Sequence, residues 1–399
     1  MACEQVTLQD VCELIVDCPH TSAKDEGVGY PLIRTPNVGR GRLILTDVHR
    51  VSQDVYERRV SRAVPRQGDL ILAREAPAGN VAIVSPGIEV CLGQRTMLLR
   101  PDSSFVVPEY LNYYLNAPEQ RDRMLRLANG ATVSHINVAD IRNMPVQLPS
   151  RGEQSKVAEL LNVLDDKIDL NNRLNDYLLE LVSSVFAYRF SNNVNTTELK
   201  NVLSISTKAL KPQEHAGEIW EHYSIPAFDE NHRPVFEPAS GIKSNKYQID
   251  SECILISKLN PSTKRIWMPY CSSNNAVCST EFIVYRPYLK EYKSFYYAAI
   301  DSPRFTDYLL EHVSGSTGSR QRAQSKDTLN YLMPNPGKEE IKDFCTFADP
   351  IYRHIQINEQ QTAKLELLRD ALLPKLMSGE IDVSKVDLTQ LTNNHLADC

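Results

Sequence analysis

Short apolar runs divide the first part of the chain and recur later in it. Each run is bounded by glycine, proline or asparagine, which is typical of strands. In the first part the runs cover residues 43–45, 69–73, 81–84 and 97–99, and in the second part residues 253–256 and 282–285. We therefore expect two groups of short strands.

A pair of helices is predicted after each group of strands. Pro108 stands where a first-turn proline is tolerated, and Tyr110, Leu111 and Tyr114 follow with helical spacing. Pro118 begins a second short helix that Gly130 would end. In the second part, residues 295–300 and 303–313 followed by Gly315 repeat the pattern.

Each part then ends in a long segment whose apolar positions alternate steps of four and three, the heptad spacing of a coiled coil. The first row consists of Val157, Leu161, Leu164, Ile168, Asn171, Asn175, Leu178, Val182 and Val185. The second row consists of Phe344, Phe347, Ile351, His354, Asn358, Gln361, Leu365, Leu368 and Leu372. Both rows have apolar ends and a polar middle, so we expect the helices to pack on each other as an antiparallel coiled coil rather than to dock separately.

Several short motifs occur twice, in the same order and at nearly constant offsets, which indicates a diverged tandem duplication. The dipeptide at Arg100 recurs at Arg286, and the one at Met144 recurs at Met333. Residues 69–72 recur at 252–255, and the turn at 130–132 recurs at 315–317. The fold class expected is α+β, with two tandem domains, each followed by a long helix.

The patterns also predict where the parts of the chain begin and end. The boundaries are domain 1 at 1–150, helix 1 at 151–190, a linker at 191–197, domain 2 at 198–336, helix 2 at 337–381 and a polar tail at 382–399.

Composition favours an intracellular protein of ordinary globular character. The chain has 399 residues, a net charge of −6 and nine cysteines without a C-x-x-C pair, which suits reduced thiols in a cytoplasm. We expect neither a membrane span nor a metal site, because no long apolar segment and no zinc-ligand spacing occur. The acidic excess lies in the two helical segments, and domain 1 carries fifteen arginines and one lysine, Lys24.

Known catalytic motifs are absent from the sequence. There is no G-x-x-x-x-G-K loop and no G-x-S-x-G elbow, and 349–352 only approaches the methyltransferase tetrad because it lacks the second proline. These absences favour a protein that binds and assembles over one that catalyses.

The ends of the two parts resemble the specificity (S) subunit of type I restriction–modification systems. Glu153-Gln154 and the segment 157–168 resemble that family's first conserved helix, and 338–351 with 372–381 resembles its second. The turns at Gly130 and Gly315 stand where the family has a Gly-Ser/Thr loop. One departure is Lys338-Glu339-Glu340 in place of Glu-Gln.

The resemblance implies two target-recognition domains, each reading one half of a bipartite, asymmetric site in double-stranded DNA. It also implies that the helices dock two modification (M) subunits, which bind S-adenosylmethionine and methylate adenine, and that a motor–endonuclease (R) subunit completes the restriction enzyme. This chain would then be non-catalytic, bind no cofactor itself, and serve DNA methylation and defence against foreign DNA.

Candidate DNA-binding residues are the donor-rich side chains of loops and strand ends, because arginine and amide groups suit phosphates and base edges. In domain 1 they are Arg34, Asn37, Arg40, Arg42, Arg74, Arg95, Thr132, Ser134 and His135. In domain 2 they are Lys243, Lys246, Lys258, Lys264, Arg265, Arg320, Gln321 and Arg322. For any one of them a solvated surface charge is the simpler interpretation.

Two other interpretations remain open from the sequence. The chain could be a coiled-coil scaffold that organises protein partners without DNA specificity, or a stand-alone enzyme with an unfamiliar site. The divergence between the two domains favours a protein that reads two different DNA half-sites over the scaffold and over the enzyme.

Overall fold

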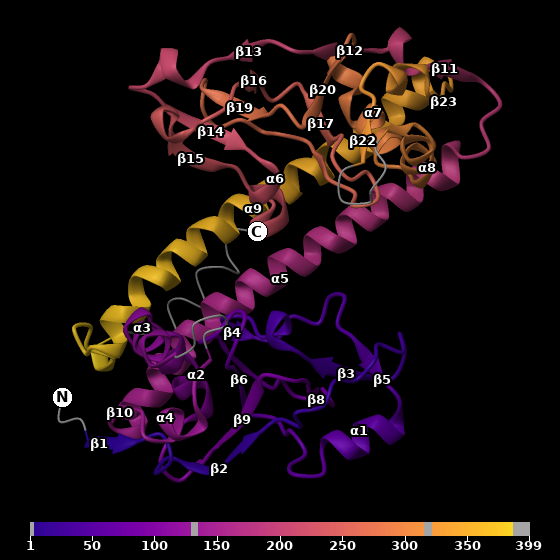
Figure 1. The fold of residues 1–399 in the computed structure, drawn as a ribbon. Coiled ribbons are helices and arrows are strands. Elements are labelled where there is room, and N and C mark those ends of the chain that lie inside the picture. The colour runs from indigo at the N-terminus through magenta and orange to yellow at the C-terminus, as the bar shows by residue number, and fades with distance from the viewer. Residues whose placement is uncertain (1–3, 129–134, 315–320, 386–399) are drawn as a thin grey trace. The chain divides into compact units, whose positions relative to one another are not determined.

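The computed structural model describes residues 4–128, 135–314 and 321–385 and mixes helices with strands (Figure 1). The chain forms two compact units: unit 1 comprises residues 1–168 and 364–399, and unit 2 comprises residues 169–363. Two long helices, α5 (Arg151–Phe190) and α9 (Lys338–Met377), each contribute residues to both units. No helix among the described residues is long and apolar enough to cross a membrane.

Unit 1 is built around a five-stranded sheet of order β2-β9-β6-β7-β4. Its strands are β1 (Glu4–Thr7), β2 (Cys12–Asp17), β3 (Tyr30–Ile33), β4 (Gly41–Arg42), β5 (Arg50–Val51), β6 (Leu70–Ala73), β7 (Val81–Ile83), β8 (Cys91–Leu92), β9 (Thr96–Pro101) and β10 (Pro145–Leu148). Its shorter helices are α1 (Gln53–Arg59), α2 (Pro108–Asn116), α3 (Pro118–Leu127) and α4 (Val138–Arg142). Smaller sheets pair β1 with β10 and place β3 between β5 and β8.

The central strand β6 is buried along its whole length because both faces of the sheet are covered. Alternate side chains of a strand point to opposite faces. Leu70 and Leu72 accordingly pack in the core that faces the helices, whereas Ile71 and Ala73 pack in a second core on the other face.

Unit 2 repeats this plan with a larger second sheet. Its strands are β11 (Thr196–Glu198), β12 (Leu203–Ser206), β13 (Ala209–Leu210), β14 (Ile219–Tyr223), β15 (Val235–Pro238), β16 (Lys246–Gln248), β17 (Ile254–Ser257), β18 (Ile266–Trp267), β19 (Ala276–Ser279), β20 (Phe282–Pro287), β21 (Val313–Ser314), β22 (Arg322–Ala323) and β23 (Leu332–Pro334). Its shorter helices are α6 (Ile225–Asn231), α7 (Lys293–Ile300) and α8 (Pro303–Glu311).

Corresponding strands of the two units have the same neighbours, which supports the predicted duplication. The order β2-β9-β6-β7 of unit 1 matches the order β12-β20-β17-β18 of unit 2, and the β1–β10 pair matches the β11–β23 pair. The β5-β3-β8 sheet of unit 1 likewise matches β15-β14-β19 of unit 2: β3 pairs with β8 in parallel as β14 does with β19, and β5 and β15 pair antiparallel with β3 and β14. Among the described segments, unit 2 extends this sheet with β13 and β16.

Two expected boundaries and one expected strand differ from the structure. Thr196 and Thr197 of the expected linker belong to β11, where they pair with Pro334 and Met333. Residues 43–45 do not form a strand, because the pairing with β7 involves Gly41–Arg42 and the chain then turns back on itself.

The core of unit 1 is completed by the C-terminal part of the chain. Leu373 and Leu376 of α9 are buried in the same cluster as Leu161 of α5 and Leu111 of α2. Val383, which the sequence places in a polar tail, is only 3% exposed and joins this cluster. An apolar side chain one short turn beyond a helix can still reach the core that the helix covers.

The core of unit 2 is completed in the same way by the end of α5. Phe186 and Phe190 pack against Phe295 of α7 and Phe344 of α9, with ring centroids 5.2–5.6 Å apart. These edge-on and tilted contacts are the favourable geometries for aromatic pairs. The cluster therefore joins both long helices to the strands of unit 2.

The two long helices run antiparallel where they pair in unit 2. The amide of Asn171 donates to Gln361 at 2.9 Å, Asn358 donates to Asn175 at 2.8 Å, and Arg189 forms an ion pair with Asp343 at 3.0 Å. Later positions on α5 thus meet earlier positions on α9.

The row expected on α5 lies at the packed face, whereas the row on α9 needs correction at two positions. On α5 all nine positions are buried or half-buried. On α9, Phe344 and Asn358 are buried, and Phe347, Ile351, Gln361, Leu365 and Leu372 are half-buried. His354 and Leu368 are exposed, because α9 buries the next residue along, such as Ile355.

Candidate nucleic-acid interface

Three segments of unit 1 that carry candidate residues lie side by side. They are the loop 34–42, the loop 74–80 between β6 and β7, and the pair His135–Ile136. The hydroxyl of Thr35 donates to the carbonyl of Ala76 at 3.1 Å, and the Asn80 amide donates to the carbonyl of Val38 at 3.0 Å. The backbone N–H of Ile136 donates to the carbonyl of Arg74 at 3.2 Å. The structure therefore gathers these separate candidates at one surface.

The hairpin loop 74–80 keeps its shape through backbone geometry. Gly79 has a φ of 85°, which favours glycine, and its N–H donates to the Ala73 carbonyl at 2.8 Å. The tip residues Ala76 and Pro77 are exposed. The loop thus presents small apolar side chains at its tip.

Arg74 is tied into this loop. Its guanidinium forms an ion pair of 2.6 Å with Asp17 on β2 and donates to the Ile136 carbonyl at 2.8 Å. The side chain is 12% exposed. Because two of its three guanidinium nitrogens are engaged within unit 1, Arg74 helps to hold the loop in place, and its expected contact with DNA stays a prediction.

Asn37 is also a structural residue rather than a reader. It is 4% exposed, its amide donates to the carbonyl of Ile44 at 3.1 Å, and its side-chain oxygen accepts from the N–H of Arg34 at 3.2 Å. Both polar ends of the side chain shape the loop. An asparagine in a turn commonly satisfies the backbone in this way.

The remaining candidates of unit 1 differ in how their charge is balanced. Arg42 pairs with Asp166 at 2.6 Å, and Arg95 pairs with Glu75 at 3.0 Å. Arg40 is exposed, whereas Arg34 and His135 are half-buried. Thr132 and Ser134 lie outside the described residues.

In unit 2, the hairpin loop between β17 and β18 is hydrogen-bonded to the segment that follows the glycine turn. The N–H of Ala323 donates to the Lys258 carbonyl at 2.9 Å, and the N–H of Asn260 donates to the Gln321 carbonyl at 2.9 Å. Asn260 has a φ of 47° before a proline, as Ala76 has a φ of 37° before a proline in unit 1. The two units therefore share a platform made of a hairpin loop and the segment that follows the turn.

Carboxylates neutralise three candidates of unit 2. Arg265 pairs with Asp229 through two bonds of 2.5 and 2.8 Å, Lys264 pairs with Asp301 at 2.5 Å, and Arg322 pairs with Glu281 at 3.1 Å.

Lys246 is corrected to a structural role. Its ammonium donates to Ser244, and burial lowers its pKa. Lys243 is exposed, Lys258 and Gln321 are half-buried, and Arg320 lies outside the described residues.

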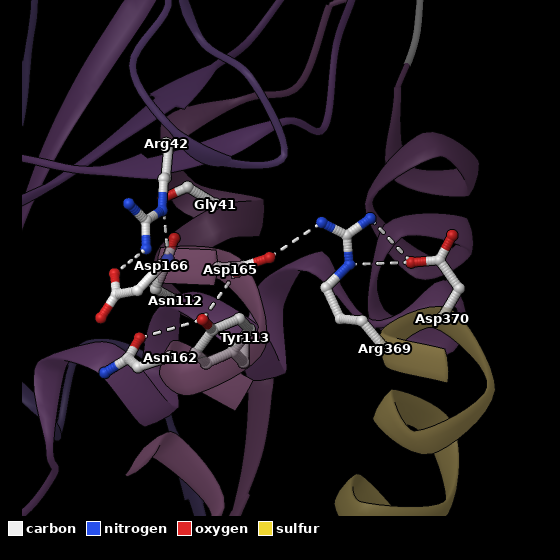
Figure 2. Close-up of polar contacts among 9 residues, drawn as sticks. All are labelled: Gly41, Arg42, Asn112, Tyr113, Asn162, Asp165, Asp166, Arg369 and Asp370. Carbon is white, nitrogen blue, oxygen red and sulfur yellow. Dashed lines mark hydrogen bonds and ion pairs between the residues drawn. The ribbon is translucent and has the colours of Figure 1, made fainter. Parts of the chain in front are cut away.

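A polar network that the sequence did not reveal joins α2, α5 and α9 in unit 1 (Figure 2). The Tyr113 hydroxyl donates to Asp165 at 2.7 Å, and Arg369 forms an ion pair with the same carboxylate at 2.9 Å. Burial and the Asp165 charge raise the pKa of Tyr113, so its hydroxyl stays protonated and donates. The three residues are distant in sequence and carry no shared motif, so no pattern could have found them.

The same view shows how the loop before β4 reaches the helices of unit 1. Arg42 points to Asp166 on α5, and the Asn112 amide donates to the carbonyl of Gly41 at 2.9 Å (Figure 2). Gly41 has a φ of 99°, a conformation that favours glycine. These contacts fix the loop that carries Arg40.

Within unit 2, α5 exposes a second apolar row. Leu170, Leu174, Tyr177 and Leu181 follow steps of four, three and four and are 57%, 36%, 62% and 45% exposed. At 3.6 residues per turn this row lies roughly 100° around the helix from the buried row that contains Asn171 and Asn175. A heptad-spaced apolar row open to solvent is a surface suited to another helix.

Comparisons with known proteins agree with this architecture. Residues 2–180 match the family model described as type I restriction modification DNA specificity domain. A Methanocaldococcus jannaschii protein named type I restriction enzyme MjaIX specificity subunit is 21% identical over 85% of this chain and 84% of its own length. The StySPI specificity subunit of Salmonella potsdam is 23% identical over 90% of this chain and 86% of its own length.

A solved structure shares the fold. The S subunit of the type I restriction–modification system of M. genitalium superimposes with a TM-score of 0.55 at 17% identity, covering 94% of this chain and 96% of the other. Residues 2–180 are therefore similar to the type I restriction modification DNA specificity domain, and the chain as a whole is similar to specificity subunits of type I restriction–modification systems.

Proposed function

We propose that this chain is the DNA sequence-recognition subunit of a type I restriction–modification complex, and that each unit reads one half of a bipartite, asymmetric site. One observation carries the proposal: both units build the same platform, yet its exposed side chains differ. The exposed loop residues are Ala76-Pro77 in unit 1 and Ser262-Thr263-Lys264 in unit 2. Small apolar groups suit the thymine methyl, whereas hydroxyls offer hydrogen bonds, so the two platforms would select different bases.

The proposal assigns no catalytic step to this chain. Adenine methylation would come from two modification subunits, which would bind S-adenosylmethionine, and DNA cleavage would come from a restriction subunit. Support comes from the match of residues 2–180 to the specificity-domain model, from the absence of known catalytic motifs in the sequence, and from side chains of the platforms that are engaged in ion pairs. A scaffold without DNA specificity would not need two diverged versions of one platform.

Exchange of one recognition domain tests the proposal. Residues 1–150 would be replaced by the matching domain of another family member, and the host genome sequenced with detection of methylated adenine. One half of the methylated motif should change and the other half should stay. A change in both halves, or in neither, would contradict two independent readers.

The exposed row on α5 is the surface proposed for a modification subunit. Leu174→Asp together with Leu181→Asp should prevent co-purification with that subunit, because two charges would enter an apolar helix contact. Ala187→Asp, on an exposed position at the opposite side of α5, is the matched control. If the double variant assembles as well as the control, the modification subunit docks elsewhere.

A further inference from the structure

A cavity of about 250 Å³ lies in unit 1 between the loop before β4, α3 and the C-terminal part of α9. Its walls include two arginines from different elements, Arg40 of the loop and Arg121 of α3. The polar network around Asp165 forms another wall (Figure 2). The cavity is therefore enclosed by charged groups, and its charge balance indicates what it can bind.

The charges on the network side are already paired with one another. Arg369 is shared between Asp165 at 2.9 Å and Asp370 at 2.9 Å, and Tyr113 donates to Asp165. Asp122 is the remaining carboxylate of the wall, and it is exposed. The lining as a whole is formally neutral, with three carboxylates and three guanidiniums, but none of these carboxylates forms an ion pair with Arg40 or Arg121.

Arg40 and Arg121 make no ion pair with any residue that the structure describes. Arg121 donates to the Asn80 side-chain oxygen at 3.0 Å, which is a neutral partner. Burial and the nearby charge of Arg40 lower the pKa of Arg121, and they outweigh the opposite effect of Asp122. Two like charges side by side in a partly buried wall are unfavourable unless an anion compensates them.

The corresponding cavity of unit 2 pairs its lysine with a carboxylate. It measures about 350 Å³ and is lined by Tyr297 and Lys264, which stand 184 positions after Tyr113 and Asn80. Lys264 forms an ion pair with Asp301 at 2.5 Å. Among the described residues, two arginines outside any ion pair are therefore a feature of the unit 1 cavity that the unit 2 cavity does not share.

We propose that Arg40 and Arg121 together bind a phosphate group, namely a backbone phosphate of the DNA at the half-site that unit 1 reads. Guanidinium groups are the preferred planar partners of phosphate oxygens, and such contacts fix the register of a protein on DNA without reading sequence. This inference rests on the proposed function and adds an anchoring site to it.

The test uses Arg40→Gln and Arg121→Gln in the complex with the modification subunit, with duplex affinity measured across a series of salt concentrations. Each variant should weaken binding several-fold, equally for specific and non-specific duplexes, and lower the slope of log K against log salt by about one. Arg121→Lys should keep most of the slope because it keeps the charge. Arg126→Gln, an exposed position on the same helix, is the control and should behave as the wild type.

Unchanged affinity and slope in both glutamine variants would overturn the inference, provided that their melting temperatures match the wild type. Inorganic phosphate supplies the second arm. If it raises the melting temperature of the wild type but not of the variants while DNA binding is unchanged, the site takes free phosphate and the DNA assignment is wrong. If the wild-type complex binds specific and non-specific duplexes equally well, the proposed function is wrong instead. The affinity of the variants for the non-specific duplex would then still show whether the two arginines bind phosphate.

Discussion

Asn358 of α9 donates a hydrogen bond of 2.8 Å to the side-chain oxygen of Asn175 on α5. The two residues stand 183 positions apart, which matches the offset between the repeated parts of the sequence. Corresponding positions of the duplicated helices are therefore direct partners. Both side chains are buried, Asn358 being 5% and Asn175 8% exposed, so the pair buries two amides in the polar middle of the contact between the helices.

Asn358→Leu should destabilise unit 2 by about 1–3 kcal/mol, because it leaves the Asn175 amide buried without this partner. The double variant with Asn175→Leu and Asn358→Leu should be at least as stable as the wild type, because polar residues in such rows fix register at a cost in stability. Urea unfolding followed by tryptophan fluorescence measures this in unit 2, where both tryptophans, Trp220 and Trp267, are located. Additive losses in the double variant would show that the amides do not act as a pair.

The stability of unit 1 should depend more on the ion pair between Asp165 and Arg369 than on the hydrogen bond between Asp165 and Tyr113. The carboxylate is 9% exposed on its side chain, so Arg369→Met would leave a buried negative charge with neutral partners, at a cost of about 2–4 kcal/mol in unfolding free energy. Tyr113→Phe removes one hydrogen bond and should cost about 1 kcal/mol. Calorimetry of the two variants compares them, and Asp370→Asn, at an exposed carboxylate, should change little. A larger loss for Tyr113→Phe would contradict this ranking.

Arg74→Ala should weaken DNA binding by a similar factor for every sequence and should also lower stability. Its guanidinium joins β2, the hairpin loop and Ile136, so its loss loosens the platform rather than removing one base contact. Affinity for the cognate duplex and for duplexes with single substitutions would be measured together with hydrogen exchange of residues 74–80. A loss confined to one base position, with unchanged exchange, would identify Arg74 as a base reader.

Unit 2 should lose stability as the pH falls below about 6.5, the ordinary pKa of histidine. Burial lowers the pKa of His222, and this outweighs the opposite effect of the hydrogen bond between the His222 ring and the accepting carboxylate of Glu237 at 2.7 Å. The unfolded chain therefore takes up a proton at a higher pH than the folded chain does, and protonation favours unfolding. Lys246 adds to the effect, since its charge also disfavours a protonated His222.

Tryptophan fluorescence of unfolding at pH 5 to 8 measures this dependence. His222→Gln should flatten the stability profile across that range. His354→Gln, an exposed position on α9, should leave the profile as in the wild type. Equal flattening by both substitutions would exclude burial of His222 as the cause.

Regular periodicity made the helices predictable, and the expected helix from about 153 to 189 corresponds to α5 (Arg151–Phe190). The same spacing carried over to α9 misplaced His354 and Leu368, because a heptad row fixes the face of a helix only to within one residue. In α9, Ile355 and Thr362 take the buried positions instead. The surfaces on which the helix packs decide which of its residues are buried, and the sequence of the helix alone does not specify those surfaces.

The candidate interface was predictable as a set of donor-rich loops but not in the role of each residue. Arg74 and Arg40 look equivalent in sequence, yet Asp17 lies 57 positions before Arg74 and neutralises it, whereas Arg40 has no such partner among the described residues. The network of Tyr113, Asp165 and Arg369 was invisible for the same reason, since its members are up to 204 positions apart in contact pairs. Charge pairing over such separations is decided by the fold.

The closure of unit 1 by Leu373 and Leu376 has a consequence for synthesis on the ribosome. The strands around β6 leave the exit tunnel early, but the residues that cover their core follow about 300 positions later, which takes roughly 15–60 s at ~5–20 residues per second. During that interval the nascent N-terminal half has an uncovered apolar face. We expect trigger-factor-like chaperones to hold it there, and a stalled chain that ends before residue 364 to remain protease-sensitive in its first 168 residues.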